Sequence, residues 1–142
     1  MIVASFYGIA GASADVTDFD ANERLIAAVL IRTRQMKGIP YFLGADLNID
    51  PKKSAVLQAE ILKGNVSDVV KDRFNGAPPP TFFRHNWADF ANDDSTSGKT
   101  RIDTFIVNAS AAHVNHDVQH YYFEAAAFDH IPIAISSYLQ AL

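Results

Sequence analysis

The segment "PYFLGADLNI" (residues 40–49) is the most informative part of the chain, because an apolar run ends in two polar side chains. Pro40 at its edge and the hydrophobic body predict a buried strand. Asp46 and Asn48 close that strand. A buried carboxylate costs free energy unless it meets a cation, a hydrogen-bond donor or a metal. Taken alone, Asp46 is better explained as a cap for the turn that follows it.

The segments before residue 40 predict a strand and a helix. "MIVASFYG" (residues 1–8) is short and apolar and predicts a buried strand that begins at the first residue. Asp20 and Glu23 have the spacing of a capping box, so a helix is expected over residues 21–37, with Gly38 as its stop. Strand, helix and strand in this order predict two parallel strands joined by a crossover.

The rest of the chain alternates helical and strand patterns. "PKKSAVLQAEILKG" (residues 51–64) has helical spacing, with Gly64 as the expected C-terminal cap. "VSDVVKDRF" fits a short helix or a loop equally well, and "TFFRHNWADF" predicts a short strand and a turn. Three further strand predictions cover "RIDTFIVN", "HVNHDVQHYYFEAA" and "IPIAISSYL".

Composition limits the class of protein. The 142 residues predict one domain, and 49% hydrophobic with 20% charged residues indicates a chain that folds. The net charge of -4 excludes a general basic field for nucleic acid or anionic membrane. There is no cysteine, so disulfides and thiolate metal sites are excluded. No apolar run approaches the roughly 20 residues that span a bilayer, and the start lacks a basic signal sequence, so an intracellular soluble protein is expected.

Polar side chains recur at strand ends in four places. They are Tyr7; Asp46 with Asn48; Asp103; and Asp129 with His130. Strand ends that point into one crevice are the usual location of an active site in α/β folds. Each of these residues has an ordinary structural explanation by itself. Together they predict one site.

These residues carry a resemblance to a known family. Tyr7, "GADLN", "TRIDTFIVN" and "FDHIPIAI" resemble, in order, the motifs of the endonuclease/exonuclease/phosphatase superfamily, which are metal-dependent phosphodiesterases and phosphatases of the deoxyribonuclease I-like fold. "PPTFFRHNW" is similar to the Thr-aromatic stretch of that family. The resemblance implies an α/β fold, the C-terminal half of a four-layer α/β/β/α sandwich, with a mixed sheet and helices on one face. Residues 1–142 would form this single domain and lack the N-terminal half.

The resemblance also implies roles for the residues. Asp46 would orient and deprotonate the attacking water, and Asn48 would hold that water or a phosphate oxygen. Tyr7 would donate a hydrogen bond to a phosphate oxygen or help to protonate a leaving group. As a tyrosine after an apolar strand, it is as readily explained by core packing.

A second set of roles concerns the later motifs. Asp103 would pair with His130, which fixes the tautomer of the imidazole and favours the imidazolium that faces a phosphate. Asp129 would lie near Mg²⁺, with Mn²⁺ as an alternative, because hard oxygen ligands suit these ions. Arg101 corresponds to a position that is often structural in the family.

The sequence departs from the family pattern at the metal site. The family's main metal-binding glutamate lies in the N-terminal half, which has no counterpart here, and this chain has only Glu23, Glu60 and Glu124. Half of a two-sheet fold would leave an apolar sheet face open, and such patches usually mark an interface. A second copy of the chain, or the missing N-terminal half, is therefore an expected partner.

Two questions of function stay open in the sequence. His113, His116 and His120 would suit zinc on a helix, but the strand pattern of their segment favours solvent-facing or cross-strand positions. The first hypothesis for the whole chain is a Mg-dependent phosphoesterase, an endonuclease that hydrolyses nucleic-acid phosphodiesters. The alternative is a catalytically silent member of the family that acts as a binding or assembly module. The choice among DNA, RNA, phosphoinositide and other phosphoesters is not encoded in the motifs.

Overall fold

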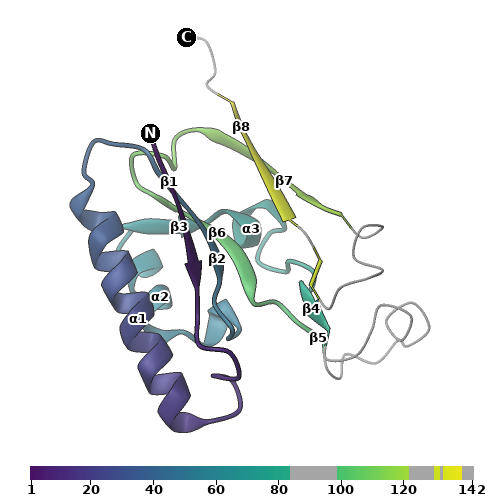
Figure 1. The fold of residues 1–142 in the computed structure, drawn as a ribbon. Helices are drawn as coiled ribbons and strands as arrows, with labels where there is room; N and C mark the ends of the chain where they lie inside the picture. Colours follow the sequence, from purple (N-terminus) through teal and green to yellow (C-terminus); the bar gives the residue numbers. More distant parts are fainter. Residues whose placement is uncertain (84–98, 122–129, 132, 139–142) are drawn as a thin grey trace.

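The computed structural model describes residues 1–83, 99–121, 130–131 and 133–138. Its centre is a four-stranded sheet (Figure 1). In spatial order the strands are β1 (Ile2–Tyr7), β2 (Tyr41–Asp46), β6 (Asp103–Asn108) and β3 (Val66–Asp68). β1 and β2 are parallel, whereas β6 runs antiparallel to both β2 and β3. The mixed sheet and the parallel first pair are confirmed.

Two helices cover one face of this sheet. α1 (Val16–Gln35) follows β1, and α2 (Ala55–Leu62) follows a single 3-10 turn, η1 (Pro51–Lys53). Residues from both helices and from β2, β3 and β6 share the main core, which includes Ile26, Leu30, Leu43, Leu57, Val66 and Ile106. This layer fixes which face of each strand is buried, because side chains alternate along a strand.

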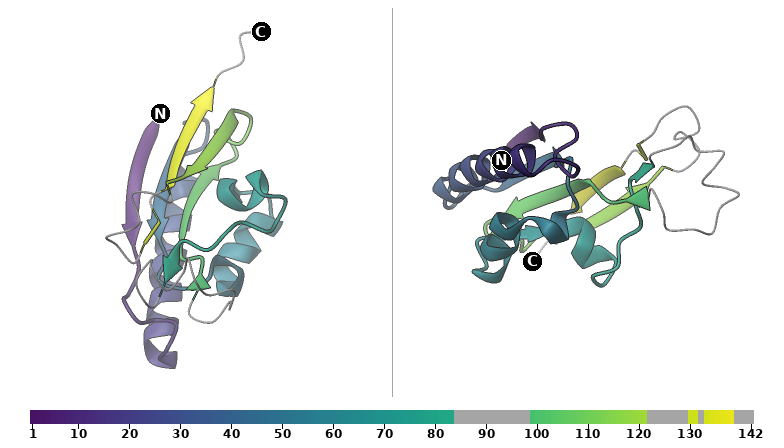
Figure 2. Two further views of the ribbon diagram at one scale, coloured as in Figure 1. Left: turned by 90° about the vertical axis from the view of Figure 1, so that its right-hand side faces the viewer. Right: turned by 90° about the horizontal axis from the view of Figure 1, so that it is seen from below.

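The opposite face carries a smaller core under a hairpin. β7 (Asn115–His120) and β8 (Ile133–Tyr138) are antiparallel and lie beside α3 (Val69–Arg73), as Figure 2 shows. The buried members of this core are Phe42, Val69, Val70, Val107, Ala111 and Val118. Two short strands, β4 (Phe82–Phe83) and β5 (Lys99–Thr100), pair with each other in a separate antiparallel ribbon. Among the residues described, no helix is both long and apolar enough to cross a membrane.

The start of α1 differs from the prediction. The helix begins at Val16 rather than residue 21, and the side chain of Asp15 accepts hydrogen bonds from the backbone N–H groups of Thr17 and Asp18. The predicted capping box of Asp20 with Glu23 is therefore wrong. Those two residues lie in the second turn of the helix, where the backbone N–H groups already have partners within the helix.

The partners of Glu23 are in another helix. Its carboxylate accepts from the hydroxyl of Ser54 and from the backbone N–H of Val56, at the start of α2. Ser54 is also the N-cap of α2 and accepts from the backbone N–H of Leu57. The carboxylate thus joins two helices and satisfies donors at the start of α2, which local spacing could not indicate.

The burial of β1 also differs from the prediction. Only one side of this strand is covered: Ile2, Ala4 and Phe6 pack against the main core, while Val3 is 71% exposed and Tyr7 is 69% exposed. The reason is the position of β1 at the edge of the sheet, since the β7–β8 hairpin packs against β6. A mostly apolar sequence led to the wrong expectation of burial on both faces.

Three further segments can be compared with their predictions; the short helix expected as one option over residues 66–74 is present, but the strand that precedes it was not predicted. Residues 66–74 contain both a short strand and a short helix, β3 and α3, and α2 ends before Gly64, whose φ of 70° suits a C-terminal cap. The strand predicted over residues 113–126 is observed as β7, with Val118 buried as expected. Tyr122, also expected to face inward, lies outside the described residues, as does most of the segment that follows β4.

Candidate active site

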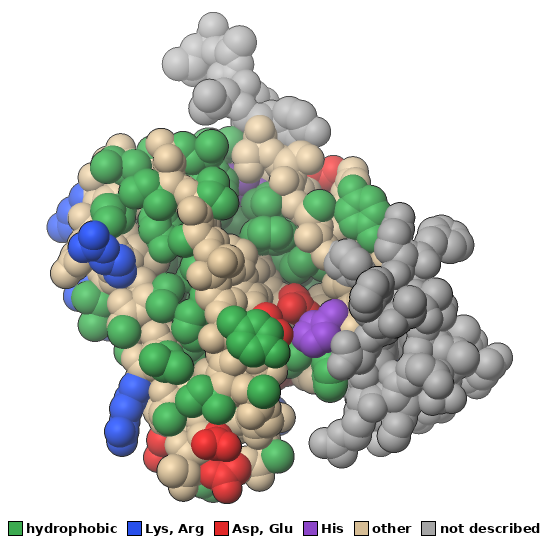
Figure 3. All heavy atoms as spheres, viewed as in Figure 1, with side chains coloured by type: hydrophobic (Ala, Val, Ile, Leu, Met, Phe, Trp, Pro, Cys, Tyr) green, Lys and Arg blue, Asp and Glu red, His purple; other side chains and the backbone are tan. Residues whose placement is uncertain are grey.

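Two strand ends bring two carboxylates together. Asp46 is the last residue of β2, and its register partner on the antiparallel neighbour is Asp103, the first residue of β6. The Nδ1 of His130 lies 3.0 Å from Oδ2 of Asp103. One potential ligand atom from each of these three residues lies within 4.8 Å of the other two. Figure 3, viewed as Figure 1, shows acidic side chains beside a histidine at the surface that faces the viewer.

The backbone after β2 is held by its own side chains. Oδ1 of Asp46 accepts a hydrogen bond of 3.0 Å from the backbone N–H of Asn48, whose φ of 53° lies in the left-handed region that asparagine tolerates. The side-chain amide of Asn48 donates to the backbone oxygen of Gly8 at 3.0 Å. These bonds fix the loop after β2 against the loop after β1. A Cβ on Gly8 would lie 2.5 Å from the oxygen of Leu47, so this close approach requires glycine.

A buried amide on α1 supports the same two loops. Asn22 is fully buried, accepts from the backbone N–H of Ile9 at 2.9 Å, and donates to the backbone oxygen of Leu47 at 2.8 Å. The sequence reasoning missed this residue. Its signal was available, because Asn22 lies four and eight residues before the buried Ile26 and Leu30, a place where a helix normally carries an apolar side chain.

Thr81 links Asp103 to the segment that carries His130. Its hydroxyl oxygen accepts from the backbone N–H groups of Ile102 and Asp103, at 3.1 and 3.0 Å. Its carbonyl oxygen accepts from the backbone N–H of Ile131 at 2.7 Å. The side chain is fully buried. The sequence reasoning noted the stretch that contains Thr81 and gave the residue no role.

The imidazole of His130 has an aromatic neighbour as well as a carboxylate. Phe82 and His130 form an isolated antiparallel bridge, and their rings meet edge to face with centroids 5.2 Å apart. The ring of His130 is thus oriented by Phe82 on one side and by Asp103 on the other. Asp129, the predicted metal ligand, lies outside the described residues.

Arg101 has a structural environment, as expected. Its side chain is 5% exposed and binds Asp68 through two hydrogen bonds of 2.7 and 3.1 Å, while a third goes to the hydroxyl of Thr104. Burial lowers the pKa of the nearby His120, and the positive charge of Arg101 lowers it further. His120 is therefore neutral near pH 7 and lies outside the site.

Tyr7 lies on the strand next to Asp46. It is the last residue of β1 and the register partner of Asp46, so the two side chains project from the same face of the sheet. Of the residues predicted from the sequence, the structure gathers Asp46, Asp103 and His130. It places Asn48 in the supporting loop and Tyr7 at the rim.

The donor set suits a divalent cation. Magnesium is commonly held by one or two carboxylates together with water and substrate phosphate, and Asp46 with Asp103 provides two carboxylates. Among the described residues this is the one group of three potential ligands so placed. Glu23 bonds to α2 and Glu60 bonds to Asn65 and Lys63, so neither contributes.

The contacts of His116 do not support a zinc site. The Nδ1 of His116 lies 2.9 Å from the hydroxyl of Ser137, and its Nε2 lies 3.0 Å from the backbone oxygen of Ala111. Both ring nitrogens are therefore used for hydrogen bonds. His116 and His120 lie on a strand, as the sequence pattern favoured.

Comparisons of the fold give clear matches, although no family model and no curated protein matches the sequence. A 3'-5' exonuclease, NExo, from Neisseria meningitidis is 22% identical with a TM-score of 0.66, over 94% of this chain and 59% of that one. The mannosyl-6-phosphatase Bt3783 of Bacteroides thetaiotaomicron is 19% identical with a TM-score of 0.57, over 94% and 51%. An endonuclease/exonuclease/phosphatase family protein from the same bacterium is 18% identical with a TM-score of 0.53, over 92% and 47%.

The chain has the fold of the endonuclease/exonuclease/phosphatase family. The resemblance found in the sequence motifs is thereby confirmed for the architecture. The chain spans about half the length of the endonuclease/exonuclease/phosphatase structures it matches, in agreement with the expected half of the four-layer fold.

Proposed function

We propose that this chain carries the water-activating and phosphate-binding residues of a metal-dependent phosphoesterase that cleaves nucleic-acid phosphodiesters as an endonuclease. The observation that carries the proposal is the convergence of Asp46, Asp103 and His130 within 4.8 Å, from segments far apart in the sequence. Like charges on Asp46 and Asp103 repel unless a cation or a proton is present. A site that brings two carboxylates together is suited to binding a cation or to transferring a proton, and not to apolar packing.

Each side chain has a task in this mechanism. Asp46, held by the backbone N–H of Asn48, takes the proton of the attacking water as general base. Asp103 accepts the Nδ1–H of His130, so that the Nε2–H of the imidazole donates to the phosphate, where negative charge develops. Tyr7 donates its hydroxyl hydrogen to a second phosphate oxygen from the adjacent strand.

Mg²⁺, or Mn²⁺ in its place, would be held by Asp129 and a carboxylate oxygen of Asp103, while Asp46 serves as the base for the attacking water. When bound, the ion polarises the phosphoryl group as a Lewis acid. The glutamate that the family uses has no equivalent among the described residues.

Nucleic acid is favoured as the substrate by the similar structures. NExo is described as a 3'-5' exonuclease and, bound to a product DNA hairpin, as a 3' phosphatase. Bt3783, a mannosyl-6-phosphatase, matches with a lower TM-score. The net charge of -4 limits the role of general electrostatic attraction, so the metal and His130 must hold the phosphate locally.

A second candidate function is a silent binding or assembly module. The coverage of about half of each similar structure favours it, because a half site lacks ligands and substrate contacts. The two functions differ in what the isolated chain does with metal and substrate.

Plasmid cleavage tests the first function. Supercoiled DNA and a generic phosphodiester are incubated with the chain and Mg²⁺ or Mn²⁺, using Asp46→Ala, His130→Ala and, as a matched surface control, Asp20→Asn. We expect metal-dependent nicking that falls by roughly 100-fold or more in the first two variants, the usual size of a general base contribution for Asp46 and of a charge-stabilising donor for His130. The control retains full activity.

The negative result is equally informative. A folded wild-type chain that shows no cleavage with any metal, also after purification with chelator and reloading, would support the silent module. Cleavage that survives Asp46→Ala would mean a contaminating nuclease or a different base.

A further inference from the structure

The donor atoms gathered at the candidate active site include a nitrogen as well as oxygens. One potential ligand atom from each of Asp46, Asp103 and His130, here called the triad, lies within 4.8 Å of the other two. A tetrahedral Zn²⁺ ion holds imidazole nitrogen and carboxylate oxygen at about 2.0–2.2 Å, which sets its ligand atoms roughly 3.2–3.6 Å apart. Small side-chain rotations are therefore enough to close the triad on such an ion.

The imidazole in the triad distinguishes between divalent ions. Mg²⁺ takes oxygen ligands and keeps several of its water molecules, whereas Zn²⁺ commonly binds histidine nitrogen together with carboxylate oxygen. Three protein ligands with a further position left for water are also the usual arrangement at zinc sites that solvent reaches. The donor set of the triad thus fits Zn²⁺ better than it fits Mg²⁺.

The ligands of the triad are held in place by hydrogen bonds that do not involve a metal. Thr81 accepts from the backbone N–H of Asp103 at 3.0 Å through its hydroxyl, and from that of Ile131 at 2.7 Å through its carbonyl oxygen. Asp46 is the register partner of Asp103 on the neighbouring strand, and Ile131 directly follows His130. A site whose ligands are positioned in advance loses less conformational entropy when the ion binds.

The triad is also open enough for an ion to enter from solvent. The side chain of His130 is 34% exposed and that of Asp103 is 18% exposed. Partial burial keeps some water from the carboxylates, and opposite charges attract more strongly where water is partly excluded. The site therefore combines access with a favourable field for a cation.

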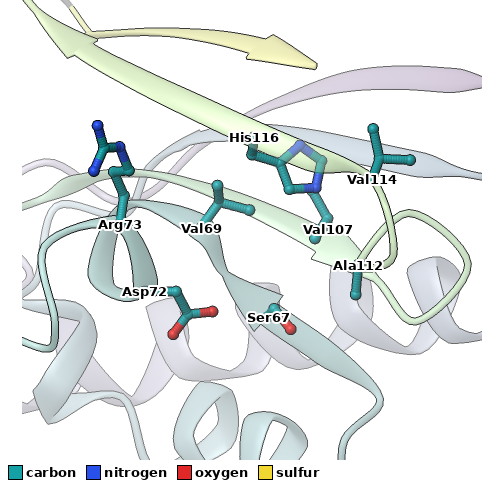
Figure 4. A pocket seen from close by; sticks show the side chains of 8 residues that line it. All are labelled: Ser67, Val69, Asp72, Arg73, Val107, Ala112, Val114 and His116. Atoms are coloured by element: carbon teal, nitrogen blue, oxygen red, sulfur yellow. The ribbon is translucent and has the colours of Figure 1, made fainter. Parts of the chain in front are cut away.

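Within the described residues, no second group of histidine and acidic side chains has this spacing. Figure 4 shows His116 at a separate hollow, where Val107 lies near the other end of β6. Both ring nitrogens of His116 are engaged, with the hydroxyl of Ser137 and the backbone oxygen of Ala111. Zinc that binds specifically to the described part of the chain is therefore expected at the triad.

We propose that Zn²⁺ binds to Asp46, Asp103 and His130 and thereby inhibits the phosphoesterase reaction at the same site. The ion occupies the carboxylate that takes the proton of water and the imidazole that donates to the phosphate. It also uses Asp103, which the catalytic Mg²⁺ needs, so the two ions compete. The inhibition rests on the proposed function, whereas the zinc site itself does not.

Calorimetric titration of the metal-free chain with zinc chloride tests the binding. We expect one site per chain, with an affinity at least about 10-fold lower in Asp46→Asn and in His130→Gln, since even residues that only support a metal ligand contribute that much. His113→Ala and Asp20→Asn remove an exposed imidazole and an exposed carboxylate elsewhere, and leave the affinity unchanged. Magnesium chloride as the titrant gives much weaker binding. The unfolding midpoint shows whether each variant is folded.

NMR spectra of the histidine rings identify the ligand directly. The ring signals of His130 are assigned by their loss in His130→Gln. We expect zinc to shift these signals with saturation at one equivalent, and to leave those of His113 and His116 in place. A shift of every histidine to the same extent would mean nonspecific binding and would contradict the triad as the site.

Plasmid nicking at a fixed Mg²⁺ concentration tests the inhibition. Nicking is expected to fall over the range of free Zn²⁺ in which calorimetry shows the triad filling, and to recover when excess Mg²⁺ displaces the zinc. Zinc binding at the triad in a chain that never nicks DNA would support the zinc site and contradict the proposed phosphoesterase function.

Three results would overturn the proposal. They are the absence of saturable zinc binding, unchanged binding in folded Asp46→Asn and His130→Gln variants, and nicking that persists when the triad is saturated with zinc. The second would place the ion elsewhere, and the third would mean that zinc does not inhibit.

Discussion

Thr81 is buried, and its hydroxyl and carbonyl oxygen atoms accept hydrogen bonds from backbone N–H groups of distant segments. Its hydroxyl oxygen serves two backbone donors at the start of β6, and its carbonyl oxygen serves the segment of His130. A threonine before two phenylalanines has no local feature that predicts these partners, because they are 21 and 22 residues away in the sequence. Asn22 acts similarly for the two loops around Asp46.

Substitution of Thr81 tests this role. Thr81→Val keeps the shape but leaves the N–H groups of Ile102 and Asp103 without an acceptor, at about 1–3 kcal/mol for each buried donor. Thr81→Ser keeps the oxygen and is expected to lose much less. Urea denaturation measures both changes in the free energy of unfolding. Equal stability of the two variants would contradict the assigned role of the hydroxyl.

The carboxylates of Glu60 and Asp72 have opposite pKa shifts, so they predict opposite responses of the folding stability to pH. The hydrogen bond from Asn65 and then that from Lys63 lower the pKa of Glu60 below its usual 4.5. Glu60 therefore stabilises the fold above pH 4.5, and this contribution is lost as the pH falls through the folded-state pKa. The pKa of Asp72 is instead raised from 3.8 by burial, so its contribution is present below pH 3.8 and lost as the pH rises through the folded-state pKa.

The corresponding variants separate the two effects. At pH 7, Glu60→Gln is expected to lower the unfolding midpoint and Asp72→Asn to raise it. Both differences should shrink when thermal unfolding is followed at pH values below these pKa ranges. A lower midpoint for Asp72→Asn at pH 7 would mean that the carboxylate has a stabilising partner.

Among the elements, β3, α3 and β6 are joined by one acidic side chain. Asp68 is 1% exposed, binds Arg101 through both oxygens, accepts from the hydroxyl of Thr104 and caps α3 at the backbone N–H of Lys71. The sequence left this region open between helix and loop. The switch from strand to helix occurs here because Asp68 satisfies groups of both elements at once.

Removal of this carboxylate should be far more costly than removal of an exposed one. Asp68→Ala leaves Arg101 as a buried charge without its partner, at about 3–5 kcal/mol. Asp117→Ala breaks the exposed pair with Arg73, which is worth about 0–1 kcal/mol. Chemical denaturation of both variants compares the two arginine-aspartate pairs directly. A loss below about 1 kcal/mol for Asp68→Ala would contradict the structural role of the network.

For the whole molecule, one side of the edge strand β1 is uncovered. In the described sheet β1 pairs only with β2, and Val3 and Tyr7 are exposed beside it. Residues 1–14 contain no charged side chain that would oppose pairing. The similar structures are about twice as long as this chain. A second copy of the chain is the occupant that we expect on this face for the isolated 142 residues.

Sedimentation equilibrium over a range of concentrations measures that association. Val3→Lys places a charge on the exposed side of β1 and is expected to shift the chain toward monomer. Ile31→Lys, at an exposed apolar position on α1, is the control that leaves association unchanged. A wild-type chain that stays monomeric throughout would count against self-association and would leave the face to another polypeptide.

The sequence alone determined the order of most strands and helices and pointed to Asp46, Asp103 and His130, which the structure brings together. Alternation placed Asp103 on the side of Phe105 and Val107, and the ordered motifs singled out Asp46 and His130. These are local signals, since strand and helix periods repeat within a few residues.

Only the tertiary structure decided which distant groups meet. Glu23 bonds to α2 instead of its own helix, and Asn22 joins loops that lie up to 25 residues away. The exposed side of β1 likewise depends on where the hairpin packs. Hydrogen-bond partners and burial are set by packing between segments, and no local period of the sequence carries that information.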